Sequence, residues 1–207
     1  MTAASMGLVH AGSVDCPDGV LLVDAAGDLP LVLGVAGDEG PGLAEWMAAG
    51  EEVPADGLAR IEREVLPGLD LLPRGGGSLD DIDRIDLLAG LLSADRRRVI
   101  VDCGTVDPDH PGELASALAG AATYSVLVIR PCYVAVRRAL RSVMRPSRLL
   151  VISERTRALD ATDVVDVLGV PLYADLDLDP AVARAVDAGL LVSRVPVGLR
   201  RGLECAA

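Results

Sequence analysis

The sequence lacks four residue types, and each absence limits what the chain can do. Its 207 residues include no Phe, Lys, Asn or Gln, and only 2% of them are aromatic. All nineteen basic residues are therefore arginines, so a site that needs a lysine ammonium cannot be built from this chain. Hydrophobic residues make up 51% of the sequence, so a core is expected, and it must consist mainly of Leu, Val, Ile and Ala.

Membrane and export signals are also missing. No uninterrupted run approaches the roughly 18–20 apolar residues that cross a bilayer. The first segment, "MTAASMGLVHAG", carries no positive charge of the kind that opens a signal peptide. The net charge of −12 argues against a surface that attracts nucleic acid or anionic lipid as a whole. The length suits a single domain over residues 1–207.

The cysteines show no pattern of a metal site or a disulfide framework. No two of them have the C-x-x-C spacing, and structural zinc sites usually show such close pairs. A zinc site that combines them with the two lone histidines is therefore disfavoured. We expect reduced thiols in a cytoplasmic protein. These residues are Cys16, Cys103, Cys132, Cys205, His10 and His110.

Short apolar runs alternate with longer amphipathic stretches, which predicts an α/β protein with a mostly parallel sheet. The runs do not alternate with polar residues, as expected for strands covered on both faces. The predicted strands are Val20–Asp24, Leu69–Leu72, Val99–Cys103, Ser125–Arg130, Arg148–Ile152 and Val170–Tyr173. The predicted helices are 42–49, 55–65, 80–93, 112–121, 133–144, 160–168 and 180–188.

Two of the predicted strands end in an aspartate. "VLLVD" ends at Asp24, and "VIVDCG" carries Asp102 near its end. A carboxylate at the tip of a buried strand is costly unless it meets a cation, a backbone amide or water. It either holds magnesium, as in phosphate-transfer proteins, or caps the turn that follows the strand. Two such strands in one α/β chain favour the magnesium site.

Six segments, in order along the chain, carry a resemblance to a known family. They are "GVLLVDAAGDLPLVLG", "GLAEWMAAG", "LDLLPRGGG", "RRVIVDCGT", "SVLVIRPCYVAVRRA" and "LGVPLYADLDLDPAVARAVDAG". Together they resemble the ParA/MinD family of deviant P-loop ATPases over nearly the whole chain. Within it they lean toward atypical members such as the CpaE/TadZ pilus-assembly proteins. The resemblance implies one twisted, mostly parallel sheet of about six or seven strands between helical layers.

The chain departs from the family at the phosphate-binding loop. The family begins with a strand, a glycine-rich loop with two lysines, and a helix that "TAASMGLVHAG" resembles. Such a loop points backbone amides and a lysine at the phosphates, and this chain has no lysine. Two explanations stay open: a pseudo-ATPase that lost the loop, or a sequence that starts at an internal Met with the loop upstream. Without the family's central first strand, "VIVDC" must pair directly with "SVLVI" or leave an open gap.

Two further positions depart from the family. Ala26 stands where the family has an aspartate that orients the attacking water, with Asp28 nearby as a substitute. Ser153 stands where the family reads adenine with an asparagine. The resemblance therefore implies a vestigial ATP and magnesium site at Asp24, Asp28 and Asp102, with Asp102 as the magnesium residue. We expect no catalytic residue, no bound cofactor and no ATP hydrolysis by this chain.

The resemblance also implies what the protein does. We expect a non-catalytic or degenerate ParA/MinD-like protein that acts through protein–protein contacts in positioning or assembling a cell-envelope, pilus or secretion apparatus. The alternative is a genuine ParA/MinD-type ATPase whose P-loop lies upstream of this chain. The family dimerises around nucleotide, so a homodimer here would need contacts that do not involve nucleotide.

One segment is strongly basic, although the chain as a whole is acidic. Residues 130–157 contain eight arginines and a single acid, Glu154. If the helix runs through residue 144, Arg137, Arg141 and Arg145 share one face, beside Arg138. This pattern indicates either a solvated helix face or a docking surface for an acidic protein partner, with DNA or lipid headgroups as less favoured ligands.

Overall fold

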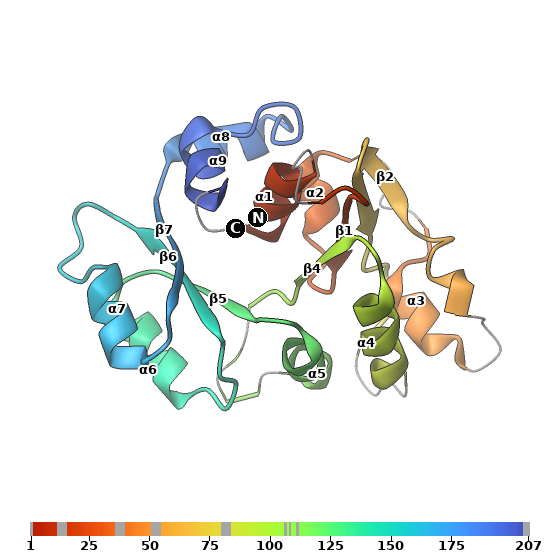
Figure 1. The fold of residues 1–207 in the computed structure, drawn as a ribbon, viewed down its shortest axis with the longest axis horizontal. Coiled ribbons are helices and arrows are strands. Elements are labelled where there is room, and N and C mark those ends of the chain that lie inside the picture. The colour runs from red at the N-terminus through yellow and green to blue at the C-terminus, as the bar shows by residue number, and fades with distance from the viewer. Residues whose placement is uncertain are drawn as a thin grey trace.

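Seven strands form two sheets, where one continuous sheet was expected. The computed structural model describes residues 2–11, 16–35, 40–50, 55–79, 84–105, 107, 109–110 and 112–204. Sheet A has the order β2-β3-β1-β4, and sheet B has the order β5-β6-β7 (Figure 1). Both are parallel except for the β2–β3 hairpin. The α/β fold class with a mostly parallel arrangement is confirmed, and the sheet is divided in two between β4 and β5.

The strands follow the apolar runs of the sequence closely. Their bounds are β1 Val20–Asp24, β2 Arg63–Leu66, β3 Leu69–Leu72, β4 Arg98–Asp102, β5 Val126–Ile129, β6 Arg148–Ser153 and β7 Leu172–Asp177. Every residue of β1 is buried, because Leu22 packs on one face of the sheet and Leu21 and Val23 pack on the other. Burial on both faces explains why this strand is an unbroken apolar run.

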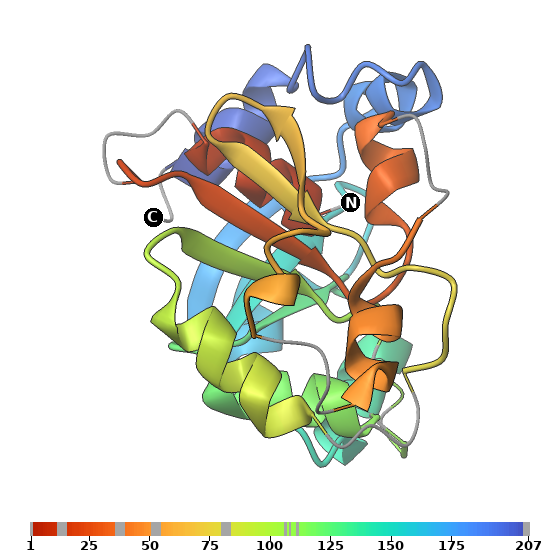
Figure 2. The same cartoon turned by 90° about the vertical axis from the view of Figure 1, so that its right-hand side faces the viewer.

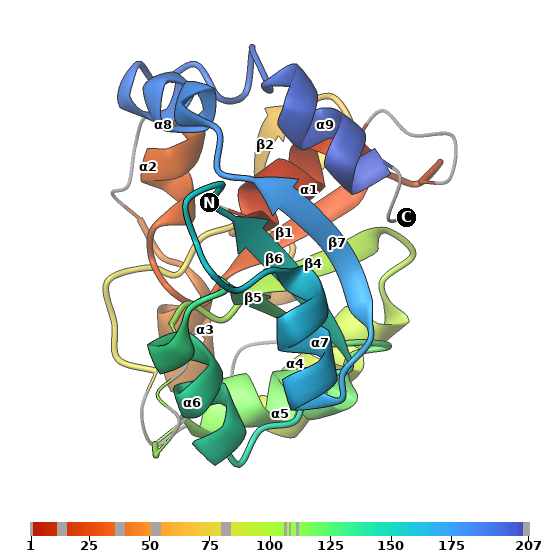
Figure 3. The same cartoon turned by 90° about the vertical axis from the view of Figure 1, so that its left-hand side faces the viewer.

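Helices cover both faces of the two sheets. They are α1 Thr2–His10, α2 Leu29–Leu33, α3 Leu43–Ala48, α4 Ile85–Ala94, α5 Glu113–Ala121, α6 Tyr133–Arg141, α7 Ala161–Leu168, α8 Pro180–Asp187 and α9 Val197–Glu204, with a short 3₁₀ helix η2 at Ala55–Gly57. In Figure 1, α1, α8 and α9 lie above the sheets, and α4 to α7 lie below them. Figure 3 shows β7 as the outer edge of sheet B.

A single core joins the two sheets on the side of α1 and α9. It contains Leu22 of sheet A, Leu150 and Leu176 of sheet B, and Leu8 and Leu203 of the two helices. On the opposite side, sheet A packs on α3, α4 and α5, whereas sheet B packs separately on α6 and α7. The helices therefore hold together two sheets that share no strand pairing among the described residues.

The predicted helix over 55–65 is wrong. Only Ala55–Gly57 is helical, and Arg63–Leu66 forms strand β2, which pairs antiparallel with β3. The two strands join at Pro67 and Gly68, whose φ of 84° a non-glycine residue rarely adopts. Figure 2 shows this hairpin at the outer edge of sheet A. The Pro-Gly turn and pairing with β3 override the helical pattern of "ADGLARIEREV".

Other boundaries differ less. Helix α6 ends at Arg141 rather than 144, because Ser142 is extended with ψ of 138°. Strand β7 begins and ends later than predicted, and α2 is an additional short helix. Helix α8 is capped by Asp179, whose carboxylate accepts a hydrogen bond from Ala181 N at 2.8 Å. The predicted start of the 80–93 helix lies outside the described residues, and α4 begins at Ile85.

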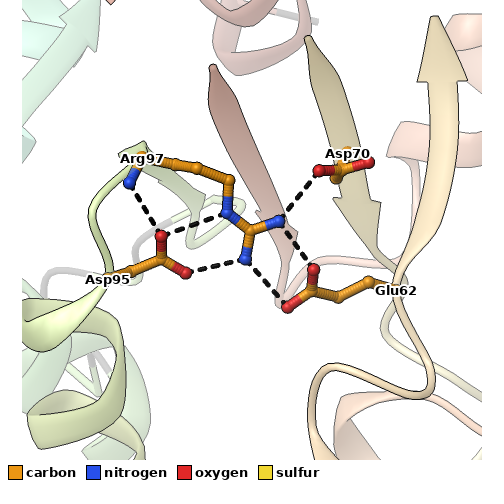
Figure 4. Close-up of polar contacts among 4 residues, drawn as sticks. All are labelled: Glu62, Asp70, Asp95 and Arg97. Atoms are coloured by element: carbon orange, nitrogen blue, oxygen red, sulfur yellow. Dashed lines mark hydrogen bonds and ion pairs between the residues drawn. The ribbon is translucent and has the colours of Figure 1, made fainter. Parts of the chain in front are cut away.

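Arg97 ties the turn before β4 to the hairpin at the outer edge of sheet A. Its guanidinium donates to Asp95, Glu62 and Asp70 at 2.7–3.1 Å (Figure 4). All four side chains are partly buried, with 14–34% of their surfaces exposed. Because Arg97 binds Asp95, the pKa of that carboxyl is lowered. One guanidinium group therefore balances the charge of three partly buried carboxylates.

We expect Arg97→Met to lower the free energy of unfolding by about 2–4 kcal/mol at neutral pH, because it leaves three partly buried carboxylates without their cation. The Asp95 pKa is depressed in the fold, so its stabilisation is present above the unfolded pKa and is lost as pH falls. The loss caused by Arg97→Met should therefore shrink below about pH 4. Denaturant titrations measure both effects. Arg97→Lys keeps the charge as a control, and a loss under about 0.5 kcal/mol would contradict the role.

Candidate functional site

A cleft separates the two sheets between β4 and β5. Its volume is about 2290 Å³, and residues of both strands line it along their whole length. Within the described residues, β4 pairs only with β1, and β5 pairs only with β6. Of the two outcomes expected for a sheet without a central strand, the structure shows the open gap. We call this space the β4–β5 cleft.

Strands β4 and β5 point in the same direction across the cleft. At their starts, the ring of Tyr124 stacks on Tyr173 with centroids 6.0 Å apart. The pKa of Tyr173 is raised mainly by burial and by Tyr124, whereas Arg98 lowers it, which places the start of β4 beside these rings. Beyond their ends, Asp109 and Arg141 form an ion pair at 3.1 Å. The residues just after each strand, Cys103 and Gly104 after β4 and Arg130 and Cys132 after β5, also line the cleft, and we call this the carboxyl edge.

Asp24 ends β1 at this edge, and its carboxylate is engaged by the loop that follows it. Oδ1 accepts from Ala26 N at 3.1 Å and Gly27 N at 2.6 Å, and Oδ2 accepts from Leu29 N at 3.1 Å. The side chain is fully buried. Burial raises the pKa of Asp24, while the three backbone hydrogen bonds oppose that rise. Of the two sequence interpretations, Asp24 has the capping arrangement, with both oxygens on backbone amides.

Asp102 and Asp28 lie at the same edge and line the cleft. Oδ1 of Asp102 accepts from Gly104 N at 2.9 Å, and the charge of Asp102 contributes to the raised pKa of Asp24. Asp28 is exposed. The structure therefore brings together the three predicted site residues. Within the part of the chain that is described, however, no group of three or more His, Cys, Asp or Glu side chains is placed to hold a metal ion.

Ala26 also faces this edge. It lines the cleft, and a Cβ placed on Gly104 would lie 3.0 Å from the Ala26 Cβ. The position therefore lies between the loops that follow β1 and β4. Ser153 is not among the residues that line the cleft; it ends β6, and its hydroxyl donates to Asp175 at 2.5 Å. The edge thus carries aspartates and a methyl group, with no basic side chain contributed by the loop after β1.

Glu45 is a residue whose role the sequence pattern did not single out. Its carboxylate accepts from Gly42 N at 2.7 Å, Gly76 N at 2.9 Å and Gly77 N at 2.8 Å. These hydrogen bonds lower the pKa of Glu45, and the bond from Gly42 N has the largest effect. The glycine loop after β3 therefore binds a carboxylate of its own chain. The spacing of Gly42 and Glu45, a helix cap and its third residue, is the signal that predicts this contact.

Three cysteines and His10 are at least partly buried, and His110 is exposed. Burial raises the pKa of the Cys103 thiol to about 11, and the Cys132 sulfur accepts from Ala135 N at the start of α6. Cys16 is buried, and Cys205 lies outside the described residues. His10 is buried against Arg98, with 3.0 Å between Nδ1 and the guanidinium. Among the helices described, none combines the length and apolar character that crossing a membrane requires.

The arginine segment is divided by the end of α6. Arg137, Arg138 and Arg141 are exposed on the helix, and Arg141 pairs with Asp109. Arg145 lies beyond the helix and donates to the backbone oxygen of Ser142, so the expected continuous face is not formed. The pKa of Asp107 is lowered by two backbone amides and, to a smaller extent, by Arg138. Acidic side chains therefore offset part of this positive charge.

We expect Asp24→Asn to lower the free energy of unfolding by about 1–3 kcal/mol, because the amide NH₂ would face one of three buried N–H donors. The raised pKa of Asp24 means that the folded state binds its proton more tightly, so stability falls as pH rises above about 3.8. The asparagine variant loses this dependence, and the difference between the two proteins should shrink toward neutral pH. Denaturant titrations from acid to neutral pH test this, with Asp28→Asn as the exposed control. An unchanged pH profile would contradict the assignment.

The comparison with solved structures identifies the fold. No protein-family model matches the chain, and no curated protein matches it. A ParA family ATPase from Chlorobium tepidum is 20% identical with a TM-score of 0.74, covering 99% of this chain and 91% of the other. MinD from Pyrococcus horikoshii, complexed with Mg-ADP, is 17% identical with a TM-score of 0.70. The MinC:MinD complex from Aquifex aeolicus is 18% identical, also at 0.70. For both, 99% of this chain and 88% of the other are covered. The chain has the ParA/MinD-like fold.

Proposed function

We propose that this chain is a ParA/MinD-like protein that does not hydrolyse ATP and acts through protein–protein contacts. Its role would be to position or assemble a cell-envelope, pilus or secretion apparatus, as its resemblance to the CpaE/TadZ proteins suggests. One protein of similar fold is a MinD in complex with MinC, which is a precedent for a protein partner on this fold. A homodimer, if formed, uses contacts that do not involve nucleotide.

The observation that carries this proposal is the chemistry of the edge between β1 and β4. Ala26 contributes a methyl group where hydrolysis would need a carboxylate to orient water. Asp24 already accepts three backbone hydrogen bonds, and the sequence contains no lysine to bind phosphate. Asp28 and Asp102 remain as candidates for residual magnesium binding, with Asp102 as the better placed of the two beside Gly104. The carboxylates of Asp28 and Asp102, at the end of β4 in the cleft, repel the phosphates of ATP.

The outer surface of α6 is the proposed contact surface for a partner. Tyr133 and Val134 are 71% and 58% exposed, and Arg137, Arg138 and Arg141 lie on the same helix. Exposed aromatic and arginine side chains are enriched in protein interfaces. The surface suits an acidic protein partner, and the net charge of −12 disfavours DNA and anionic membranes.

We expect calorimetry to detect no binding of Mg-ATP to this chain, and we expect phosphate release to stay at the level of a protein-free blank. Ala26→Asp supplies the missing carboxylate. It should not restore hydrolysis, because the chain still has no lysine to bind the phosphates. The ParA family ATPase of similar fold serves as the positive control. A dissociation constant on the order of micromolar or tighter would overturn the proposal.

A second candidate is an ATPase completed by a strand and loop ahead of Thr2. It is favoured by the place of α1: His10, at one end, contacts Arg98 at the start of β4, and Thr2, at the other end, lines the cleft. Thr2 therefore lies toward the edge that carries Asp102. The reading frame ahead of Met1 separates the candidates. An in-frame strand followed by "GG-x-G-(K/R)-(S/T)" supports the ATPase, and a stop codon supports the non-catalytic protein.

A further inference from the structure

Helix α6 has one face against sheet B and the opposite face in solvent (Figure 1). Ala135, Val136 and Ala139 pack in the core that α6 and α7 share with sheet B. The residues of the opposite face are exposed, and each is either apolar or basic: Tyr133, Val134, Arg137, Arg138 and Arg141. Steps of three and four residues place them on adjacent rows of the helix. We call these five residues the α6 surface.

A carboxylate of the chain itself already lies on this surface. Asp109 belongs to the segment after β4, and its Oδ1 and Oδ2 lie 3.1 and 3.4 Å from one guanidinium nitrogen of Arg141. The two residues are 32 positions apart, so the tertiary structure brings them together. The ligand that the α6 surface binds within its own chain is therefore a carboxylate.

Asp107 holds the turn that presents Asp109 to the helix. Its Oδ1 accepts from Asp109 N at 2.8 Å and from His110 N at 3.3 Å. These two hydrogen bonds lower the pKa of Asp107, and the charges of His110 and Arg138 lower it further. Two acids therefore lie close to the arginines in the last turn of α6, which are Arg138 and Arg141.

The first half of the α6 surface is left open by these contacts. Tyr133 and Val134 are more than half exposed. Arg137 forms no ion pair with any carboxylate that the structure describes. An exposed aromatic ring beside an exposed arginine is typical of protein interfaces. The surface thus has an open half at the start of the helix and a half that acids of the same chain engage.

We propose that the α6 surface binds an acidic segment of a partner protein, and that Asp107 and Asp109 compete with this segment for Arg138 and Arg141. The charge supports this choice of ligand, because residues 130–157 carry eight arginines and one acid. The carboxylate of Asp109 on Arg141 shows the same chemistry within the chain. The inference rests on the proposed function, since it names the chemistry of the partner and an intramolecular competitor for its site.

The internal contact is weak enough for a partner to displace. The side chains of Arg141 and Asp109 are 67% and 54% exposed, and ion pairs exposed to this degree add little stability in water. A single external carboxylate would only replace the one already present. A segment with several acids and an apolar side chain for Tyr133 gains contacts in both halves of the surface. The competition therefore selects partners that engage the whole surface.

The test measures the affinity of a fluorescently labelled helical peptide, with glutamates and leucines at helical spacing, for the full chain at about 50 mM salt. Asp109→Asn should bind the peptide about two- to fivefold more tightly than the unchanged chain, because Arg141 is released. Asp187→Asn makes the same change of charge at the exposed end of α8 and should leave the affinity as it is. Equal affinities of the Asp109→Asn variant and the unchanged chain would overturn the proposal, as would no binding to either.

A double-mutant cycle separates competition from general repulsion. In the Arg141→Gln background Asp109 has lost its partner, so Asp109→Asn should have no more effect than the Asp187→Asn control. Arg137→Gln should weaken binding about two- to fivefold and leave the effect of Asp109→Asn intact. If Asp109→Asn tightens binding equally with and without Arg141, the acid acts only through its charge, and competition is refuted. All these side chains are exposed, so the variants should fold.

The same variants distinguish other occupants of the surface. Binding of duplex DNA or phosphatidylserine vesicles that depends on Arg137 and Arg141, with no binding of the peptide, would contradict a protein partner. Self-association that is lost in the Arg137→Gln/Arg141→Gln variant would identify a second copy as the occupant instead. A chain extended by the reading frame ahead of Met1 should still bind the peptide. Loss of binding there would show that the chain covers its own α6 surface, which also refutes the proposal.

These results are separate from the test of the proposed function. Binding of Mg-ATP would overturn the absence of nucleotide chemistry and leave the peptide affinities unchanged. Failure of the peptide to bind would remove the acidic partner from α6, while the result with Mg-ATP would stand.

Discussion

The backbone of a parallel sheet must form hydrogen bonds on both sides of each inner strand, and this constraint decides how the molecule is arranged. Strands β1 and β3 meet it, and their residues are buried almost completely. Among the residues that the structure describes, β4 and β5 form strand hydrogen bonds on one side each, so sheet A and sheet B are separate and the cleft lies between them. Helices α1 and α9 pack on both sheets in one shared core, and this packing holds the two sheets together.

The carboxyl edge of the sheets is held in shape by carboxylates that bind backbone amides. Asp24 binds the loop before α2, and Glu45 binds the glycine loop after β3. Each interaction satisfies N–H groups that would otherwise be left without partners at a loop or helix start. The loop after β1 and the glycine loop after β3 thus bind the protein's own acids. The chain's own backbone amides therefore occupy these carboxylates, which is one reason why we propose a role in protein contacts.

Much of the fold could be predicted from particular residues, and the errors have physical reasons. "VLLVD" and "LDLL" form strands at the predicted residues, because their apolar runs are too short for helices and are bounded by turn residues. The helix expected at 55–65 failed because pairing with β3 decides the structure of Arg63–Leu66. The placement of Asp24 and Asp102 at one edge followed from strand ends, whereas Asp28 was named from the family resemblance. The hydrogen-bond partners of Asp24 did not, since the sequence pattern favoured a magnesium site and the structure shows three backbone amides on this carboxylate.

The sequence by itself determined the α/β class, the order of most elements and the chemical limits of the chain: no lysine, an alanine at position 26 and aspartates at two strand ends. These follow from composition and local periodicity, which act over a few residues. Only the tertiary structure decided which strands pair, which faces are covered and where Arg97 and Glu45 find their partners. Those contacts join residues about 30 positions apart, and they depend on the geometry of the packed sheets. The unpaired edges of β4 and β5 belong to this second group, because a strand is an edge only in relation to its neighbours.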